Sequence, residues 1–217
     1  MQSNDINQAY ATEQEAFWAG EFGNNYIGRN VSETYLASNI ALFARILSKT
    51  TAVSSVLEFG ANAGLNLQAI AQLLPSSELS AVEINQNAVQ KLQQLLNGRV
   101  NVYHNSILDK ELPPLNADFV LIKGVLIHIN PEHLGQVYEK LFNSSRRYIC
   151  IAEYYNPSPV EIVYRGHHNK LFKRDFAGEM LDKYSDLKLI DYGFVYHRDS
   201  NFPQDDTTWF LLEKTTP

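Results

Sequence analysis

The chain has 217 residues, enough for one ordinary domain with a short terminal elaboration, and its 45% hydrophobic content supplies a sizeable core. Its 18 basic and 24 acidic residues give a net charge of −6, which disfavours nucleic acid or an anionic membrane as partner, since both need a broad basic face. Cys150 is the single cysteine, so an internal disulfide is excluded; without a long apolar run or a signal-peptide pattern, we expect a cytoplasmic protein.

Beyond about the first thirty residues, apolar strand-like runs alternate with helical patterns, which is typical of a parallel α/β sheet. Strands are predicted at Ser55–Phe59, Glu78–Glu83, Val100–His104, Ala117–Ile122 and Tyr148–Glu153. Helices are predicted at Leu65–Leu74, Gln86–Leu96, Pro131–Leu141 and about Arg174–Tyr184.

The end of the chain breaks this alternation. Leu187–His197 and Thr207–Lys214 are both β-rich, and no crossover helix fits between them, so they should pair antiparallel. We therefore expect a mostly parallel seven-stranded sheet with one antiparallel C-terminal strand. Residues 1–40 are expected to form a helical lid segment, and residues 41–217 the single domain.

A glycine-rich turn follows the first strand, in VLEFGANAGLN (56–66). A dinucleotide-binding fingerprint would need glycine at positions 62 and 65, which are Asn62 and Leu65. Glu58 on the strand tip repels a phosphate but suits a ligand that carries an ammonium group. S-Adenosylmethionine is such a ligand, and its carboxylate can use the N–H groups at the start of the next helix. Gly60 and Gly64 would let the backbone approach it closely.

Glu83 ends the next strand, in LSAVEIN. An acid at this position accepts hydrogen bonds from ribose hydroxyls. Two acids on successive strand tips, on either side of a glycine turn, together indicate a pocket for S-adenosylmethionine.

Four segments, VLEFGANAG (56–64), AVEIN (81–85), HNSILD (104–109) and DFVLIKGVLIHINP (118–131), resemble the motifs of the class I S-adenosylmethionine-dependent methyltransferases. The resemblance covers about residues 40–214 and implies a Rossmann-like three-layer sandwich that releases S-adenosylhomocysteine as product. It assigns to the cofactor Glu58, Phe59, Gly60, Asn62, Gly64, Glu83, Ile84, Asn105, Ser106, Ile107, Lys123 and Gly124. Asn62 departs from the middle glycine of the family's first motif.

Segments near both ends carry a narrower resemblance. TEQEAFWAGEFGNNYIGRN (12–30), YRGHHNKLFKRDFAGEMLDKY (164–184) and FPQDDTTWFLLEK (202–214) resemble the methylases associated with pseudaminic acid biosynthesis. This resemblance suggests a bacterial surface-sugar pathway but does not identify the methyl acceptor.

The N-terminal segment carries aromatic residues at helical spacing, among them Trp18 and Tyr26. These residues either pack as an ordinary apolar stripe or form a lid whose aromatic faces attract the sulfonium. In the second interpretation, Tyr26 and Arg29 reach the methionine carboxylate, for which the planar donors of arginine are suited.

The acceptor is expected at the carboxyl ends of the parallel strands, where loops 123–130, 153–170 and 197–206 should meet. The second loop is too long to be a simple connector. It begins at Tyr154 and Tyr155, and from 165 to 174 it collects Arg165, His167, His168, Lys170, Lys173 and Arg174. This basic cluster predicts a small anionic acceptor, such as a sugar nucleotide or sugar acid; a solvated loop is the alternative.

Three side chains are candidates for chemistry on the acceptor. His128 is either a general base or a hydrogen-bonded packing residue. Asp205 and Asp206 face the same region and could bind hydroxyls or accept a proton. The adjacent histidines 167 and 168 do not suggest a metal, because they point in different directions on most backbones.

Two other classes of protein remain open from the sequence. One is a nicotinamide-dependent oxidoreductase, and the other is a non-catalytic cofactor-binding partner of a sugar pathway. The sequence does not indicate the oligomeric state or the acceptor atom.

Overall fold

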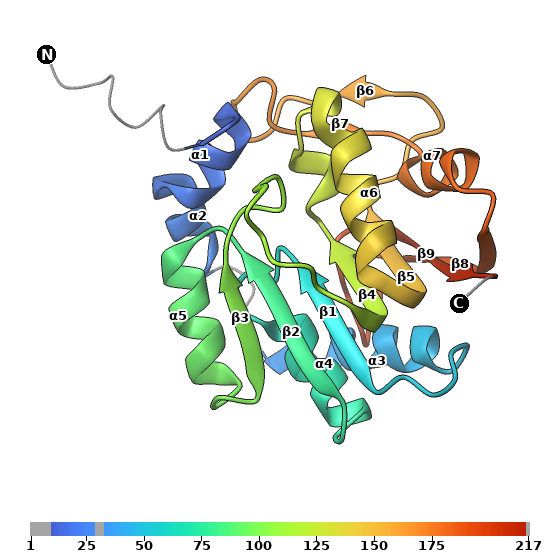
Figure 1. Cartoon of the computed structure of the whole chain (residues 1–217). Helices are drawn as coiled ribbons and strands as arrows, with labels where there is room; N and C mark the ends of the chain where they lie inside the picture. Colours follow the sequence, from blue (N-terminus) through green and yellow to red (C-terminus); the bar gives the residue numbers. More distant parts are fainter. Residues whose placement is uncertain (1–9, 29–32, 216–217) are drawn as a thin grey trace, which may run out of the picture.

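The computed structural model describes residues 10–28 and 33–215, and it shows one central sheet with helices on both faces (Figure 1). The strand order is β3-β2-β1-β4-β5-β9-β8, which confirms the predicted Rossmann-like sandwich. Its strands are β1 (Ser55–Phe59), β2 (Glu78–Glu83), β3 (Val100–His104), β4 (Ala117–Lys123), β5 (Ser145–Glu153), β8 (Leu187–Val195) and β9 (Thr207–Lys214). Two short strands, β6 (Val160–Glu161) and β7 (Phe172–Lys173), pair separately.

Seven α-helices are present in the described part of the chain: α1 (Glu13–Ala19), α2 (Glu21–Tyr26), α3 (Glu33–Leu47), α4 (Leu65–Leu73), α5 (Gln86–Leu95), α6 (Leu134–Ser144) and α7 (Phe176–Lys183). Asp175 caps α7, since its Oδ1 accepts from Gly178 N at 2.8 Å. The helix predicted from Pro131 begins with a 3-10 turn, and Asn130 caps that turn through Glu132 N.

The last two strands are not arranged in chain order. β9 is the antiparallel strand, as predicted, and it lies between β5 and β8. Trp209, Leu211 and Leu212 are fully buried on β9, whereas β8 exposes most of its side chains. The strand whose side chains are more deeply buried therefore lies inside the sheet, and β8 forms the edge.

Each face of the sheet has its own apolar core. Phe43 of α3 and Ile70 of α4 pack on one face. Leu141 of α6 and Met180 of α7 pack on the other. The strands, buried on both sides, hold the carboxyl ends of β1, β2, β4 and β5 at one edge of the molecule.

The N-terminal region divides differently from the expectation. The predicted boundary at residue 40 falls inside α3, whose Leu42 and Ile46 belong to the core. Only α1 and α2 lie apart from the sheet, above the strand ends (Figure 1). None of the described helices is long and apolar enough to cross a membrane.

Candidate active site

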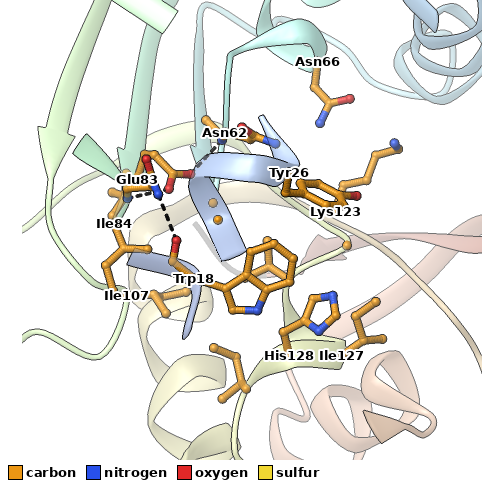
Figure 2. A pocket seen from close by; sticks show the side chains of 18 of the residues that line it. Trp18, Tyr26, Asn62, Asn66, Glu83, Ile84, Ile107, Lys123, Ile127 and His128 are labelled. Carbon is orange, nitrogen blue, oxygen red and sulfur yellow. Dashed lines mark hydrogen bonds between the residues drawn. The ribbon is translucent and has the colours of Figure 1, made fainter. Parts of the chain in front are cut away.

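A pocket opens at the carboxyl ends of the parallel strands, and α1, α2 and α3 all contribute residues to its lining. Trp18 of α1 and Tyr26 of α2 are seen there in Figure 2. The residues predicted from the sequence that line it are Tyr26, Gly60, Asn62, Glu83, Ile84, Asn105, Ser106, Ile107, Lys123, Gly124, His128, Tyr154 and Asp205. The fold thus gathers side chains from seven segments of the chain. Arg29 lies outside the described residues.

The glycine turn after β1 uses left-handed backbone at three alternate positions. The φ angles are 73° at Gly60, 47° at Asn62 and 85° at Gly64. A Cβ at Gly60 would come within 2.4 Å of Val125 Cγ2, so only glycine fits there. Asparagine tolerates the left-handed region better than most residues, which explains how Asn62 replaces a glycine.

Glu83 connects this turn to the start of α5. Its Oε2 accepts from Asn62 N at 2.7 Å (Figure 2), and its Oε1 accepts from Asn85 N at 2.8 Å. Burial raises the pKa of Glu83, and these N–H bonds act against that rise. The carboxylate lines the pocket and keeps lone pairs for further hydrogen bonds.

Glu58 is placed differently from the prediction. It is fully buried and does not line the pocket; instead Oε1 accepts from Asn66 Nδ2 at 2.6 Å. Burial raises the pKa of Glu58 to about 8, although the nearby Lys123 ammonium opposes the rise. Asn66 and Lys123 present the polar groups to the pocket at this place. Glu58 lies behind them in the core and holds the Asn66 side chain.

Two further predicted cofactor residues stay outside the pocket. Phe59 is completely buried in the core, because strand side chains alternate between faces. Gly64 starts α4, and a Cβ there would meet Leu92 Cγ at 2.9 Å. Gly64 therefore allows close packing of α4 against α5 and not the approach of a ligand.

The loop after β4 is held by Glu153 at the end of β5. Its Oε1 accepts from Val125 N and Leu126 N, both at 2.9 Å. This carboxylate is 3% exposed, and burial raises its pKa to about 7. By fixing the backbone at 125 and 126, Glu153 positions His128 at the end of the same turn.

His128 has a defined tautomer. Its Nδ1 lies 2.5 Å from Lys170 O, and a carbonyl only accepts, so Nδ1 carries the proton and Nε2 is the free base. Burial lowers the pKa of His128 to about 4, which keeps the ring uncharged at neutral pH. The packing that the sequence suggested is present, since Trp18 and Tyr164 lie against the ring at 4.5 and 5.0 Å between centroids.

Helices α1 and α2 are tied down over the pocket by polar contacts. Asn85 Nδ2 donates to Trp18 O and to Asn24 Oδ1, both at 3.0 Å. Ser106 Oγ donates to Glu15, and Lys170 Nζ lies 2.9 Å from a carboxylate oxygen of Glu13 in α1. The cover thus contacts the segments that follow β2 and β3 and, through Lys170, the loop after β5.

Two buried polar atoms of α1 have no hydrogen-bond partner within the described residues, and both belong to residues that line the pocket. They are Gln14 Oε1 and Trp18 Nε1. Gln14 is oriented because its Nε2 donates to Asn169 O at 2.9 Å, which leaves the oxygen unmatched. Both atoms are therefore available for hydrogen bonds to a ligand in the pocket.

The far end of the pocket is lined by Tyr35 from α3, Tyr154 after β5, and Asp205 before β9. Burial is the main cause that raises the pKa of both tyrosines, and the charge of Asp205 adds to it. The side chains at this end therefore offer one carboxylate and two phenols, which suit hydroxyl groups of a ligand.

The basic cluster lies outside the pocket lining, and part of it is neutralised. Lys170 pairs with Glu13, and Arg174 pairs with Glu179 at 2.5 Å. His167 packs on Phe17, with 5.1 Å between ring centroids.

The remaining predicted acceptor residues do not line the pocket either. His168 lies 3.8 Å from Glu161 on the surface. Tyr155 is exposed and lies against Phe210. Arg165 sits over the Tyr164 ring, 5.6 Å from its centroid.

Asp206 is not placed for catalysis on a ligand in this pocket. Its carboxylate is exposed, lies outside the lining, and bonds His197 Nδ1 at 2.8 Å. Asp205, its neighbour in sequence, lines the pocket. The structure therefore places Asp206 outside the pocket that gathers the other candidate residues, and its role as a general base stays a prediction.

Residues 56–147 match the family model of a methyltransferase domain. The protein is an S-adenosylmethionine-dependent methyltransferase. The enzyme class predicted from the sequence is confirmed. No curated protein sequence matches this chain.

Several solved structures share the fold of this methyltransferase. The plantazolicin methyltransferase BpumL, in complex with a pentazolic desmethylPZN analogue and SAH, has TM-score 0.60 and 17% identity over 88% of this chain and 89% of its own. Magnesium protoporphyrin IX methyltransferase (ChlM) from Synechocystis PCC 6803, with bound SAM, has TM-score 0.63 and 11% identity over 94% and 98%. The 1,6-didemethyltoxoflavin-N1-methyltransferase of Burkholderia thailandensis has TM-score 0.64 and 15% identity, over 89% of this chain and 83% of its own. At these identities the likeness shows the fold alone.

Sequence reasoning missed several pocket residues of the methyltransferase: Gln14, Glu15, Tyr35, Asn39, Asn66, Asn85, Glu153, Tyr164 and Thr207. Glu153 had a usable signal, because it is an acid at the end of a buried parallel strand, like Glu83. Gln14 and Tyr35 had none, since they reach the pocket only through the packing of α1 and α3.

The methyltransferase has two tryptophans, which allows a direct test of the cover. Trp18 lines the pocket, whereas Trp209 is completely buried in the core beside Arg45. S-Adenosylhomocysteine should therefore change the intrinsic fluorescence of the wild type, and Trp18→Phe should lose most of that change. Trp209→Phe is the matched control and should retain it. A change that survives in Trp18→Phe would contradict contact between cofactor and cover.

Proposed function

We propose that this methyltransferase transfers its methyl group to a small, anionic, sugar-derived acceptor of a bacterial nonulosonic acid or surface-sugar pathway. The observation that carries the proposal is the arrangement of two cations at the rim. Arg165 lies over the ring of Tyr164 and Lys173 over that of Tyr154, at 5.6 and 5.1 Å, and both tyrosines line the pocket. Neither cation forms an ion pair with a carboxylate in the described part of the chain.

The other half of the argument is the polar end of the pocket below these cations. Asp205, Tyr35 and Tyr154 offer hydrogen-bond partners for several hydroxyl groups. An acceptor that combines hydroxyl groups with a negative charge would bind both the two cations at the rim and the hydrogen-bonding side chains at this end. The structural neighbours act on a peptide-like compound, a porphyrin and a toxoflavin precursor, so the acceptor has to be inferred from this chain's own residues.

The cofactor is proposed to lie across the strand ends. Glu83 accepts from the ribose hydroxyls, and Ile84, Ser106 and Ile107 surround the adenine. Lys123 and Tyr26 lie at the other side of the pocket and bind the methionine end (Figure 2). Asn66 replaces Glu58 as the polar contact to this end, because it lines the pocket and Glu58 does not.

The residues of this chain then act by positioning and by proton removal. When bound, S-adenosylmethionine supplies an electrophilic methyl carbon on a positively charged sulfur. Tyr35 and Asp205 hold the acceptor hydroxyl in line with that carbon. His128 lines the pocket with Nε2 unprotonated, so this nitrogen would accept the proton of the acceptor hydroxyl. Helices α1 and α2 exclude water, and they must open for exchange of ligands.

The experiment is transfer of labelled methyl groups into a bacterial sugar-nucleotide extract, followed by identification of the product. With the acceptor in hand, Arg165→Ala combined with Lys173→Ala should raise KM about 10- to 100-fold, since each lost charge contact is worth about a factor of ten or less. S-Adenosylhomocysteine affinity should be unchanged.

Arg174→Ala is the matched control, because that guanidinium already pairs with Glu179 and should leave KM unaltered. An uncharged labelled product, or a KM unaffected in the double variant, would overturn the anionic acceptor. A protein that binds the cofactor but labels no sugar would instead support a non-catalytic partner.

A further inference from the structure

One main-chain carbonyl in the loop after β5 fixes the tautomer of His128. His128 Nδ1 lies 2.5 Å from Lys170 O, so this carbonyl holds the proton on Nδ1. A neutral imidazole can carry its proton on either nitrogen, and only the form protonated at Nδ1 leaves Nε2 able to accept a proton. The position of the Lys170 carbonyl therefore decides whether His128 presents a base to the pocket.

Two side chains of α1 hold the loop at this carbonyl. Gln14 Nε2 donates to Asn169 O at 2.9 Å, and the Gln14 side chain is buried. Glu13 Oε1 lies 2.9 Å from Lys170 Nζ, in an ion pair whose lysine side chain is also buried. Helix α1 thus contacts two consecutive residues of the loop, one of which carries the carbonyl that faces His128.

The backbone at this point needs support from its surroundings. Asn169 has a φ of 57°, in the left-handed region that few residues other than glycine adopt. A conformation of this kind persists where neighbouring contacts hold it. On the other side of the loop, Asn169 N donates to Glu161 Oε1 at 2.8 Å, but Glu161 is exposed. The buried part of the support therefore comes from α1.

The same helix is also tied to the cofactor side of the pocket. Asn85 Nδ2 donates to Trp18 O at 3.0 Å, and Ser106 Oγ donates to Glu15. The Trp18 ring lies against the His128 ring, with 4.5 Å between their centroids (Figure 2). If α1 moves away from the strand ends to admit a ligand, its contacts to both sides of the pocket break together. The support of the Lys170 carbonyl is then lost as well.

We propose that Gln14 and Glu13 are positioning residues, which hold Lys170 O against His128 Nδ1 so that Nε2 is a proton acceptor only while α1 covers the pocket. In accepting the proton of the acceptor hydroxyl, the ring becomes a cation with a proton on each nitrogen. This inference rests on the proposed role of His128 as the base. It does not depend on whether the acceptor is anionic or derived from a sugar.

The tautomer of His128 is measured by heteronuclear NMR of isotope-labelled histidine rings, in the full chain saturated with S-adenosylhomocysteine. The chain has six histidines, and the spectrum of His128→Gln assigns the resonance. The wild type should be protonated mainly at Nδ1. Gln14→Met removes the donor to Asn169 O at nearly constant side-chain length. It should raise the ratio of Nε2- to Nδ1-protonated ring about five- to tenfold, the effect of one net hydrogen bond.

Glu13→Gln should shift the same ratio in the same direction but by less, because the Glu13 carboxylate is 60% exposed and water screens the ion pair. Glu21→Gln is the matched control, at an exposed residue in the first turn of α2, and should keep the wild-type spectrum. Circular dichroism of each variant should match the wild type, which excludes unfolding as the cause. A tautomer that stays on Nδ1 when Glu13→Gln and Gln14→Met are combined would overturn the proposal.

Once the acceptor is identified, kcat separates positioning from simple packing. In Gln14→Met, kcat should fall in proportion to the fraction of ring protonated at Nδ1, because only that fraction is competent. A shifted tautomer with unchanged kcat would overturn the positioning role and show that Nε2 is not the proton acceptor. An unshifted tautomer would overturn this inference alone, because the proposed function does not require α1 to set the tautomer.

Discussion

Glu83→Ala is expected to weaken binding of S-adenosylhomocysteine about 100-fold or more, measured by calorimetry. The side chain accepts from Asn62 N and Asn85 N, so its loss releases both the glycine turn and the start of α5. Hydrogen bonds to a charged group contribute about 1.5–3 kcal/mol each, and two are lost before any contact to ribose is counted. The affinity of Glu83→Gln should lie between those of the wild type and Glu83→Ala, because its amide keeps one acceptor oxygen.

Asp118→Ala is a suitable control for the general effect of removing a carboxylate that holds backbone. Asp118 accepts from Ser54 N and Ser55 N, at 2.9 and 3.1 Å, at the opposite end of the sheet. The Arg146 guanidinium and these donors hold its pKa well below the usual range, although burial acts the other way. This variant should lose stability and keep its cofactor affinity. A folded Glu83→Ala with nearly wild-type affinity would place the cofactor elsewhere.

His128→Gln is expected to lower kcat about 10²- to 10⁴-fold, the usual contribution of a general base. Cofactor affinity should stay within about threefold, because the substitution keeps a donor for Lys170 O and removes only Nε2 as base. The measurement is single-turnover transfer of labelled methyl to the identified acceptor.

The pH dependence provides a second readout for His128. A base works when unprotonated, so the rate falls as pH drops through the pKa of the folded protein. Because burial lowers that pKa to about 4, the fall should occur well below the usual 6.5 of imidazole. His133→Gln, at a residue outside the pocket lining, should leave both kcat and the profile unchanged. Full activity in His128→Gln would show that the acceptor needs no base from this residue.

Strand positions were predictable because each depends on a short run of neighbours. β1, β2, β3 and β9 begin and end where their apolar runs do, and the glycine turn follows from its own local backbone. The start of α7 was predicted only approximately, at about Arg174. The structure selects Asp175 by the bond it receives from Gly178 N.

The local backbone just outside β5 and β9 decided which of two adjacent candidates reached the pocket. Asp205 lines it and Asp206 does not; Tyr154 lines it and Tyr155 does not. The sequence places each pair at the correct edge of the sheet but cannot tell which member faces inward.

By itself, the sequence determined the α/β sheet, the turn around Gly60 and the acid at Glu83, because their signals lie within a few residues of one another. Only the tertiary structure decided that Glu58 turns away from the pocket and that Glu153 supports the loop before His128. The same holds for Gln14, whose amide is fixed by Asn169, 155 positions away in sequence. These contacts join distant segments, so packing and burial set them and no local pattern records them.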